Sequence, residues 1–515
     1  MVATVTFGER SSPSPAVADR AARGASGFAA AGVGQGEVVA MMLRNDFPFL
    51  EVTVAAGLLG AYVTPVNWHN TVDEVSYVVR DCGAKAVVIH ADLLRKLKDD
   101  MSEGVVVVQV PTPPELMEAY SISAEDAAPL PGYPIWTEWV KQFEPRPDMG
   151  ITAPGSMIYT SGTTGRPKGV RREPPTPEQV EGTKNMINAV CGSGPWADQP
   201  ETIRVLLSGP IYHSTPNAWL GHFYGLGANI WIAPKFDPEQ MLANVERWKI
   251  THLLAVPTMF VRLLRLPVEV KKKYDLSSLK FVMHGAAPCP VHVKREMINW
   301  WGPIVHEHYG GTETGAVTYL NAEEWLAHPG SVGKVIDHVT LKVLDDQGQE
   351  VGPNVPGEIA AWHKHYANFT YHGDDAKRAK ADREGLMALG DVGYFDKDGY
   401  LYLAGRASDM IISGGVNIYP AEIEAEILKL PGVADSAVFG IPDDEFGEKV
   451  MAVIQPQTGV TLDIKSVEAD LRKSLAGYKV PRRIEFSDTL PREDSGKIFK
   501  RKLRDPFWEN AGRSI

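Results

Sequence analysis

The sequence has little cysteine and no excess of positive charge. Only three of its 515 residues are cysteines, Cys82, Cys191 and Cys289, and no pair has the spacing of a metal motif or a disulfide framework. The formal net charge is −12, which argues against a general nucleic-acid or anionic-membrane binder, because such proteins need a basic face. An anionic small molecule would have to be held by local cations and backbone N–H groups.

The sequence also lacks a long apolar run. The longest stretch, residues 52–66, is rich in Gly and Ala and is shorter than the roughly 20 residues that a spanning helix requires. The first residues lack the basic segment and apolar run of a signal peptide. We therefore expect no integral membrane segment and, with so few cysteines, a location in the cytoplasm.

Short β-branched runs alternate with helical patterns along the first part of the chain. Strands are predicted at 38–43, 62–66, 86–90, 203–208, 251–256, 279–284 and 303–308, and helices at 48–59 and 72–82. Alternation of this kind predicts an α/β fold with mostly parallel sheets covered by helices. Ligands of such sheets usually bind at the carboxyl ends of the strands.

The pattern changes near residue 396, and the length of the chain already favours more than one domain. Strands are predicted at 400–404, 410–413, 433–439 and 449–455, with helices at 421–430 and 466–475. This is a compact α+β unit of about a hundred residues, a common size for one domain. We predict an N-terminal domain at 1–405, a hinge at 406–409 and a C-terminal domain at 410–515.

The segment YTSGTTGRPKG at 159–169 combines hydroxyls, glycines and two cations after a short apolar run. Glycines let the backbone approach an anion, while hydroxyls, N–H groups and the side chains of Arg166 and Lys168 bind phosphate oxygens. The segment predicts a polyphosphate cradle. It is not a Walker A loop, because the spacing from Gly162 to Lys168 differs and no Gly-Lys-Ser/Thr follows.

The same segment resembles the phosphate loop of the adenylate-forming superfamily, in particular its branch of acyl-CoA synthetases and aryl-acid CoA ligases. Further motifs of that superfamily follow in its order: GAAP at 285–288, YGGTE at 309–313, GD at 390–391, GR at 405–406, SGGVNIYP at 413–420 and PREDSGK at 491–497. The resemblance implies a large N-terminal domain and a small, mobile C-terminal α+β domain.

The resemblance also implies an ATP site. Tyr309 would stack on adenine against a wall formed by 285–287, Asp391 would accept from the ribose hydroxyls, and Arg406 would reach the ribose or the phosphates. The full set of implied ATP-binding residues is Thr160, Ser161, Gly162, Thr163, Thr164, Gly165, Lys168, Gly285, Ala286, Ala287, Tyr309, Gly310, Asp391 and Arg406.

The chemistry joins two anions, a carboxylate and the α-phosphate of ATP, so that the site must above all neutralise charge. By the resemblance, Lys497 bridges the two anions, Thr312 reaches the α-phosphate and Glu313 holds Mg²⁺, an ion that prefers carboxylate and phosphate oxygens. Without the resemblance, Lys497 would be assigned to a run of basic residues, and such a run is ordinarily a solvated face.

His213 matches the histidine that closes the acyl pocket of acyl-CoA synthetases. Members that bind α-amino acids usually place an aspartate close by for the ammonium, and 211–217 contains none, so a plain carboxylic acid is favoured. The predicted acyl pocket consists of His213, Ala218, Trp219, His284, His308 and Ala316. This mixture favours an aryl, arylalkanoic or polycyclic acid, with a medium or long fatty acid as the alternative.

Coenzyme A would enter along a tunnel formed by Ser413, Gly414 and Gly415. The hinge residue would be Ser408, where relatives usually carry Asp or Lys, and Leu389 replaces a common Thr before the Gly-Asp pair. Two other activities stay open at this point: an enzyme that loads a carrier protein, and a luciferase-like oxygenase or inactive binding protein. A homodimer is also left open.

Overall fold

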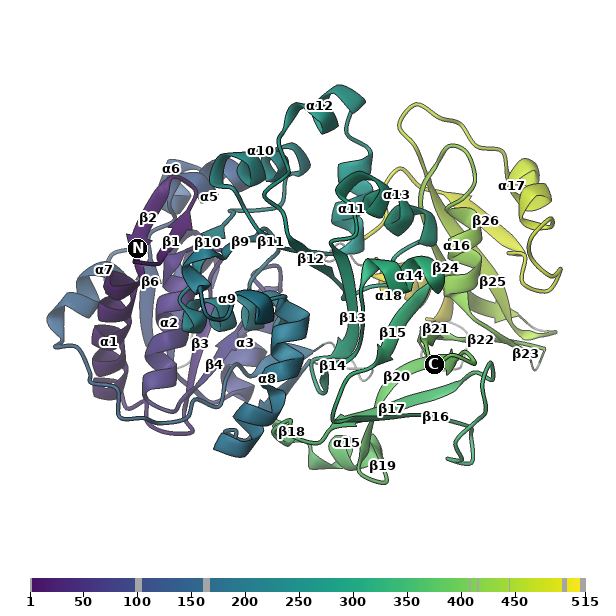
Figure 1. Ribbon diagram of the computed structural model, residues 1–515. Helices are drawn as coiled ribbons and strands as arrows, with labels where there is room; N and C mark the ends of the chain where they lie inside the picture. Colours follow the sequence, from purple (N-terminus) through teal and green to yellow (C-terminus); the bar gives the residue numbers. More distant parts are fainter. Residues whose placement is uncertain are drawn as a thin grey trace.

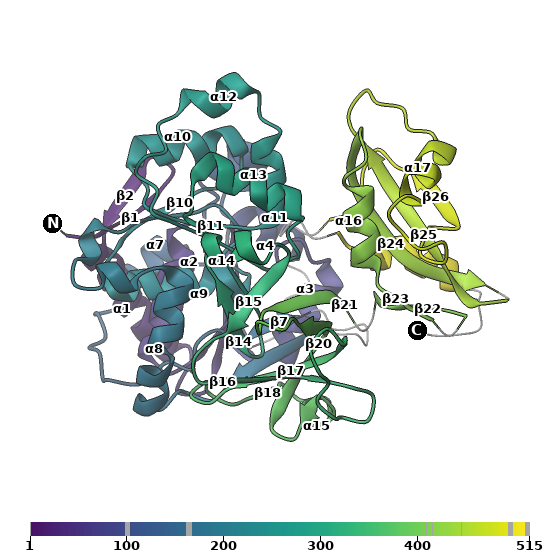
Figure 2. The same ribbon diagram turned by 45° about the vertical axis from the view of Figure 1, so that its right-hand side comes forward.

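The computed structural model describes residues 2–97, 104–160, 167–406, 409–414, 416–443, 445–492 and 498–509. A large N-terminal part carries most of the helices and three sheets, and a smaller unit of strands β22 to β26 with helices α16 and α17 stands beside it (Figures 1 and 2). Among the described residues no helix is both long and apolar enough to cross a membrane.

The helices run as follows: α1 Ser14–Ala30, α2 Phe47–Leu58, α3 Val72–Asp81, α4 Ala91–Leu97, α5 Pro114–Tyr120, α6 Ala124–Ala127, α7 Trp136–Trp139, α8 Pro177–Cys191, α9 Ser214–Leu226, α10 Pro238–Trp248, α11 Pro257–Leu264, α12 Val268–Lys273, α13 Val291–Trp301, α14 Ala322–Ala327, α15 Asp375–Lys380, α16 Pro420–Ile427, α17 Ile464–Leu471 and α18 Lys500–Trp508.

A parallel sheet of order β4-β3-β5-β6 forms from the first βα repeats. Its strands are β3 Val38–Met42, β4 Tyr62–Pro65, β5 Ala84–His90 and β6 Val106–Val110. Helix α3 begins at a capping box, in which Thr71 and Glu74 each accept from the other's backbone N–H, a motif that fixes a helix start from sequence alone. The strands and helices predicted for this region are confirmed.

The main sheet has the order β16-β17-β20-β21-β15-β14-β13-β12-β11-β9-β10-β1-β2. The strands from β1 to β13 along this order pair in parallel. They are β1 Thr4–Phe7, β9 Arg204–Leu207, β10 Asn229–Ile232, β11 His252–Ala255, β12 Phe281–His284 and β13 Val305–Gly311, with β2 Arg10–Pro13 antiparallel at the edge. This half agrees with the predicted α/β alternation.

The other half of the main sheet is antiparallel. Its strands are β14 Gly315–Leu320, β15 Ser331–Val335, β16 Val339–Leu344, β17 Gly357–His363, β20 Leu386–Phe395 and β21 Leu401–Arg406, and β19 Asp382–Arg383 pairs with β20. None of these strands before residue 396 was predicted from the sequence. In β16, buried Leu341 and Val343 alternate with the more exposed Thr340 and Lys342, the weaker signal of a sheet with one solvated face.

Two smaller sheets complete the fold. Strands β7 Ile158–Thr160, β8 Lys168–Arg172 and β18 Phe369–Tyr371 form the order β18-β8-β7. The C-terminal sheet has the order β23-β22-β25-β24, with β26 on β25; its strands are β22 Ile411–Ser413, β23 Val416–Ile418, β24 Val433–Asp443, β25 Gly447–Pro456 and β26 Arg483–Phe486. Sheet membership therefore changes between Arg406 and Ile411.

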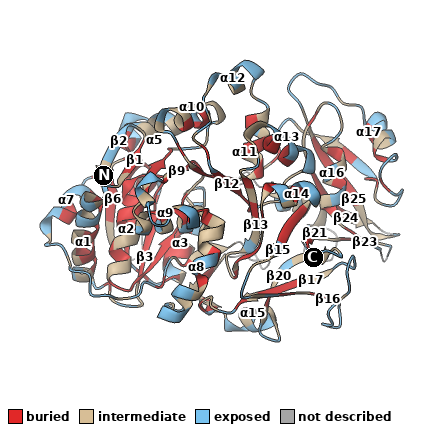
Figure 3. Ribbon diagram, in the orientation of Figure 1, coloured by how far each residue is buried: buried red, intermediate tan, exposed pale blue. Residues whose placement is uncertain are grey.

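The buried residues follow the strands and the inner faces of the helices (Figure 3). The largest apolar cluster joins α1, α2, the parallel sheet of β3 to β6 and one face of the main sheet around Phe28, Trp136 and Trp219. The C-terminal unit has its own apolar cluster, which includes Ile411, Ile423 and Ile454. Because it buries its own core, this unit satisfies a basic requirement of a domain.

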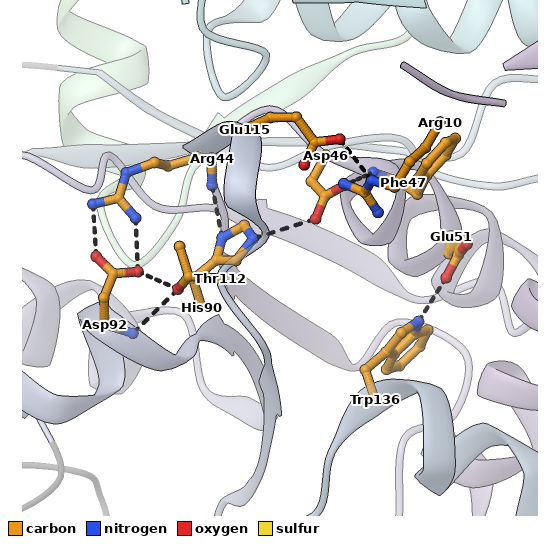
Figure 4. Close-up of polar contacts among 10 residues, drawn as sticks. All are labelled: Arg10, Arg44, Asp46, Phe47, Glu51, His90, Asp92, Thr112, Glu115 and Trp136. Atoms are coloured by element: carbon orange, nitrogen blue, oxygen red, sulfur yellow. Dashed lines mark hydrogen bonds and ion pairs between the residues drawn. The ribbon is translucent and has the colours of Figure 1, made fainter. Parts of the chain in front are cut away.

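A buried polar network lies at the carboxyl ends of β3, β5 and β6 (Figure 4). The Arg44 guanidinium binds both oxygens of Asp92, with 2.9 Å from Nη1 to Oδ1 and 2.8 Å from Nη2 to Oδ2. Thr112 donates to Asp92 at 2.7 Å, and His90 Nδ1 accepts from the backbone N–H of Arg44. Strand ends that often bind ligands are thus occupied here by internal contacts.

A second buried ion pair lies under the main sheet. Lys294 of α13, fully buried, donates to Glu307 Oε2 of β13 at 2.6 Å, and His284 Nε2 lies 3.5 Å from the same oxygen. Burial raises the pKa of Glu307 while the Lys294 ammonium opposes that shift. Burial also holds the pKa of His284 well below its ordinary value, so the imidazole is neutral.

We expect Lys294→Ala to reduce the free energy of unfolding by about 3–5 kcal/mol, because it leaves the Glu307 carboxylate buried without its cation. The double substitution Lys294→Met with Glu307→Leu should recover most of that loss, since two apolar side chains need no partner. Thermal and urea unfolding of the three proteins would measure both effects. A double variant as unstable as Lys294→Ala would contradict this account.

Candidate active site

One continuous cavity of about 3130 Å³ is lined by residues of both domains. Of the residues predicted from sequence, those in its lining are Thr160, His213, Ala218, Trp219, Gly285, Ala286, Ala287, His308, Tyr309, Gly310, Thr312, Glu313, Ala316, Asp391 and Arg406. The motifs that are distant in sequence therefore meet around one space, at the carboxyl ends of the parallel strands β12 and β13.

Tyr309, Asp391 and Arg406 form a chain of contacts on one wall. The Tyr309 hydroxyl donates to Asp391 Oδ2 at 2.7 Å, and Arg406 Nε lies 3.4 Å from Asp391 Oδ1. Burial, followed by the Asp391 charge, raises the pKa of the Tyr309 hydroxyl well above its ordinary value. The phenol thus stays protonated and orients the carboxylate, and Arg406 approaches from the last residue of β21.

Two glycines of this wall are required by close packing. A Cβ on Gly310 would lie 1.9 Å from the carbonyl oxygen of Gly315, and one on Gly285 would lie 2.9 Å from the carbonyl oxygen of His308. The register of β13 and β14 shifts between Tyr309 and Gly310, as at a β-bulge that redirects a side chain. Next to Gly285, Ala286 adopts a positive φ of 68°, a conformation that costs energy for a residue with a Cβ.

Two residues that were not predicted from the sequence, Arg172 and Tyr371, hold the Thr312–Glu313 turn, and a third, Lys377, packs on Tyr371. Arg172 Nη2 donates to the carbonyl oxygens of Thr312 and Glu313, each at 2.6 Å. The Tyr371 hydroxyl donates to Glu313 Oε1 at 3.0 Å, and the Lys377 ammonium lies 4.2 Å from the Tyr371 ring centre. Arg172 follows the phosphate loop in a basic Arg-Arg pair that could have indicated it; Tyr371 and Lys377 carried no local signal.

Glu313 has the donor chemistry for a divalent cation. One carboxylate oxygen is occupied by Tyr371, and within the described ranges no hydrogen bond or ion pair is assigned to the other. Burial lowers the pKa of Lys377, and the nearby charge of Lys168 lowers it further, whereas the charge of Glu313 raises it. Lys377 and Lys168 therefore both interact electrostatically with the groups at this turn. The carboxylate oxygens of Glu313 are of the ligand type that Mg²⁺ prefers.

Helix α9 brings the predicted acid-binding residues beside the Thr312 turn. His213 is its N-cap, and Ser214 Oγ accepts from Thr312 Oγ1 at 3.4 Å. Ala218 and Trp219 follow on the same helix and line the cavity, as His308 and Ala316 also do. Residues of α8 that were not predicted, among them Met186, Ile187, Val190 and Cys191, extend this apolar wall.

The structure does not bring every predicted residue into the lining. His284 is fully buried beneath it, against Glu307, and Lys168, Ser413 and Gly414 also lie outside it. Gly414 has a positive φ of 59° and donates its backbone N–H to the Phe446 carbonyl. The predictions for Ser161, Gly162, Thr163, Thr164, Gly165, Ser408, Gly415 and Lys497 fall outside the described residues.

The fold and the site together define a class: a two-domain enzyme of the adenylate-forming superfamily. The sequence profile of the AMP-binding enzyme family matches residues 15–368, and that of the AMP-binding enzyme C-terminal domain matches residues 422–497. The chain therefore belongs to the AMP-binding enzyme family.

Curated relatives and solved structures match over nearly the whole chain. A feruloyl-CoA synthase of Amycolatopsis sp is 33% identical over 95% of this chain and 92% of its own length. An indoleacetate–CoA ligase of Aromatoleum aromaticum is 31% identical over 97% and 94%. The ATP-bound crystal structure of MatB from Rhodopseudomonas palustris is 28% identical, with a TM-score of 0.80 over 99% of this chain and 96% of that one.

Proposed function

We propose that this protein is an ATP-dependent, AMP-forming carboxylic acid–CoA ligase whose substrate is an aryl, arylalkanoic or polycyclic acid. The observation that carries the proposal is the convergence on one cavity of the Tyr309–Asp391–Arg406 wall, the Thr312–Glu313 turn and the apolar wall of α8 and α9. The first two suit a nucleotide and its phosphates, and the third suits an apolar acid.

In the first half-reaction a carboxylate oxygen of the acid attacks the α-phosphorus of ATP, and pyrophosphate leaves along the phosphate loop. Tyr309 and the backbone of 285–287 hold adenine, Asp391 accepts from the ribose hydroxyls, and Thr312 donates to the α-phosphate. Lys497 offsets the negative charge between carboxylate and phosphate, where electrostatic stabilisation is most effective. Mg²⁺ bound at Glu313 would neutralise phosphate charge during this step.

In the second half-reaction the CoA thiolate attacks the acyl carbon and AMP leaves. We propose that the C-terminal domain, residues 410–515, turns about the hinge at 406–409 between the two steps, and that Ser413, Gly414 and Gly415 then border the pantetheine tunnel. The change of sheet membership between Arg406 and Ile411 supports a boundary there, because hinges concentrate dihedral change in a few residues.

The acid class is supported by the lining and by the relatives. Trp219, His308 and the α8 side chains provide apolar and aromatic contacts, and the described part of the α9 start offers no aspartate for an ammonium group. Feruloyl-CoA synthase and indoleacetate–CoA ligase are named for aromatic acids. The three cysteines are unpaired, which fits the cytoplasmic location that we also propose.

The test is release of AMP and pyrophosphate from Mg·ATP, with and without CoA, across benzoates, cinnamates, polycyclic acids and fatty acids from C4 to C18. We expect AMP release that requires both an aromatic acid and CoA. A preference for fatty acids would contradict the proposed aromatic or polycyclic acid class and indicate a fatty acyl-CoA synthetase. Pyrophosphate exchange that does not depend on CoA would indicate a carrier-protein ligase. No release with any acid would contradict the ligase itself.

A further inference from the structure

His222, on α9, is a cavity residue that the reaction scheme above does not use. It lines the same cavity as the apolar side chains of α8 and α9, among them Val190 and Trp219. A polar imidazole in an apolar wall is costly to bury without hydrogen bonds. The hydrogen bonds of His222 therefore indicate which kind of ligand group this part of the cavity can bind.

One side of the imidazole is fixed by the protein. His222 Nε2 lies 2.9 Å from Ser193 Oγ, and Ser193, which is fully buried, donates its hydroxyl proton to Asn188 Oδ1 at 3.0 Å. The backbone N–H of Ser193 also donates to the Asn188 carbonyl, so this serine has a fixed position. A hydroxyl has a single proton, so the Ser193 oxygen accepts from His222 when that proton is donated to Asn188.

In this arrangement Nε2 carries the proton and Nδ1 is an acceptor. Burial lowers the pKa of His222, which keeps the ring in this neutral form. Within the described part of the chain no group donates to Nδ1, and the residue borders the cavity. The acceptor is thus available to a molecule in the cavity, and its position on a rigid helix gives it a defined location.

The location relative to the reacting carboxylate follows from helix geometry. His213 is the N-cap of α9, and His222 lies nine residues later, a rise of about 13 Å along the helix axis. Side chains lean toward the helix N-terminus, which shortens the distance from the carboxylate. A donor group that reaches Nδ1 must therefore stand at the far end of an extended acid.

We propose that His222 selects acids that carry a hydroxyl group at the end opposite the carboxylate, through a hydrogen bond from that hydroxyl to Nδ1. The proposal rests on the proposed ligase function and narrows its substrate class to ω-hydroxyaryl acids. Ser193 and Asn188 are positioning residues, because they set the tautomer of His222 without contacting the acid.

The test compares matched acids that differ only in hydroxyl against methyl: 4-hydroxycinnamate with 4-methylcinnamate, and 5-(4-hydroxyphenyl)pentanoate with its 4-methylphenyl analogue. We expect kcat/KM to favour the hydroxyl member by about tenfold or more in at least one pair, because the methyl compound leaves Nδ1 unpaired. Equal kcat/KM within both pairs would overturn the proposal, provided that the acids are turned over.

Two substitutions separate the roles of the two ring nitrogens. Gln places its amide near Nε2, so His222→Gln keeps the contact with Ser193 and removes the acceptor; we expect the hydroxyl-to-methyl ratio of kcat/KM to fall to about one. Asn places its amide near Nδ1, so His222→Asn should retain much of the ratio. A ratio unchanged by His222→Gln would overturn the proposal.

Ser193→Ala provides an independent variant if either His222 substitution prevents folding. This substitution removes the group that sets the tautomer of His222 and does not contact the acid. The hydroxyl-to-methyl ratio of kcat/KM should therefore fall partway, while KM for ATP stays close to that of the unmodified protein. A ratio unaffected by Ser193→Ala in a folded protein would overturn the role of the serine. Failure of every acid to release AMP would instead count against the ligase function, and the two failures are thereby distinguishable.

Discussion

Lys497→Ala is expected to abolish adenylation while largely sparing the second half-reaction. The lysine would offset the charge between the incoming carboxylate and the α-phosphate, and loss of one such group typically costs about 10²–10³-fold in rate. Thiolysis of a preformed acyl-adenylate needs no such charge, so it should fall by less than about tenfold. The measurements are pyrophosphate release for the first step and acyl-CoA formation from synthetic acyl-adenylate for the second.

Lys473→Ala is the matched control for this experiment. Lys473 also lies in the C-terminal domain and carries the same charge, but its side chain is 76% exposed and pairs with Asp470 on the surface. Exposed pairs of this kind contribute little, and both half-reactions should be retained. Equal loss of the two half-reactions in Lys497→Ala would contradict the assignment of the lysine to adenylation.

Arg172→Lys is expected to lower kcat by about 10–100-fold although the charge is kept. Arg172 reaches the carbonyl oxygens of Thr312, Glu313 and Ala367 with its two terminal nitrogens, and its guanidinium stacks on Tyr366 at 4.1 Å. A lysine has neither the fork nor the planar face. The Thr312–Glu313 turn would shift, and displacements near 1 Å can cost about a hundredfold in rate.

Arg171→Lys is the control from the neighbouring position. Arg171 donates to the Gly36 carbonyl and stacks on Tyr62, with no contact to the turn. Because Arg172 acts through the Thr312–Glu313 turn, its substitution should lower kcat more than it raises KM for ATP. A general loss of folded protein would instead lower the amount of active enzyme in both the Arg172→Lys and the Arg171→Lys variants. Activity of Arg172→Lys within about twofold of the unmodified protein would contradict the role of the guanidinium.

Local chemistry made much of the architecture predictable. The βα alternation of residues 38–90 depends on period-2 and period-3.6 patterns and on caps such as Thr71 with Glu74, all of which are short-range. Antiparallel strands of 331–395 such as β16 were missed because one face of the strand is partly solvated, which leaves a weaker pattern than a strand buried on both faces.

The candidate site likewise contains residues that local motifs predicted and contacts that they did not. Tyr309, Thr312, Glu313 and Asp391 stand in contiguous motifs, so their residue types and spacing already indicated nucleotide chemistry. Tyr371 contacts Glu313 across 58 residues of sequence and Arg172 contacts Thr312 across 140, and neither contact follows from any local pattern. His284 looked like a pocket residue by position, yet it turns under the sheet to Glu307.

The sequence by itself determined the family, the order of the motifs and the requirement for charge neutralisation, since each of these resides in short segments whose chemistry can be inferred without coordinates. Only the tertiary structure decided which side chains line the cavity, how Arg172 holds the Thr312–Glu313 turn, and that His222 Nε2 lies against Ser193. The physical reason is that orientation, burial and tautomer depend on partners brought together from distant parts of the chain.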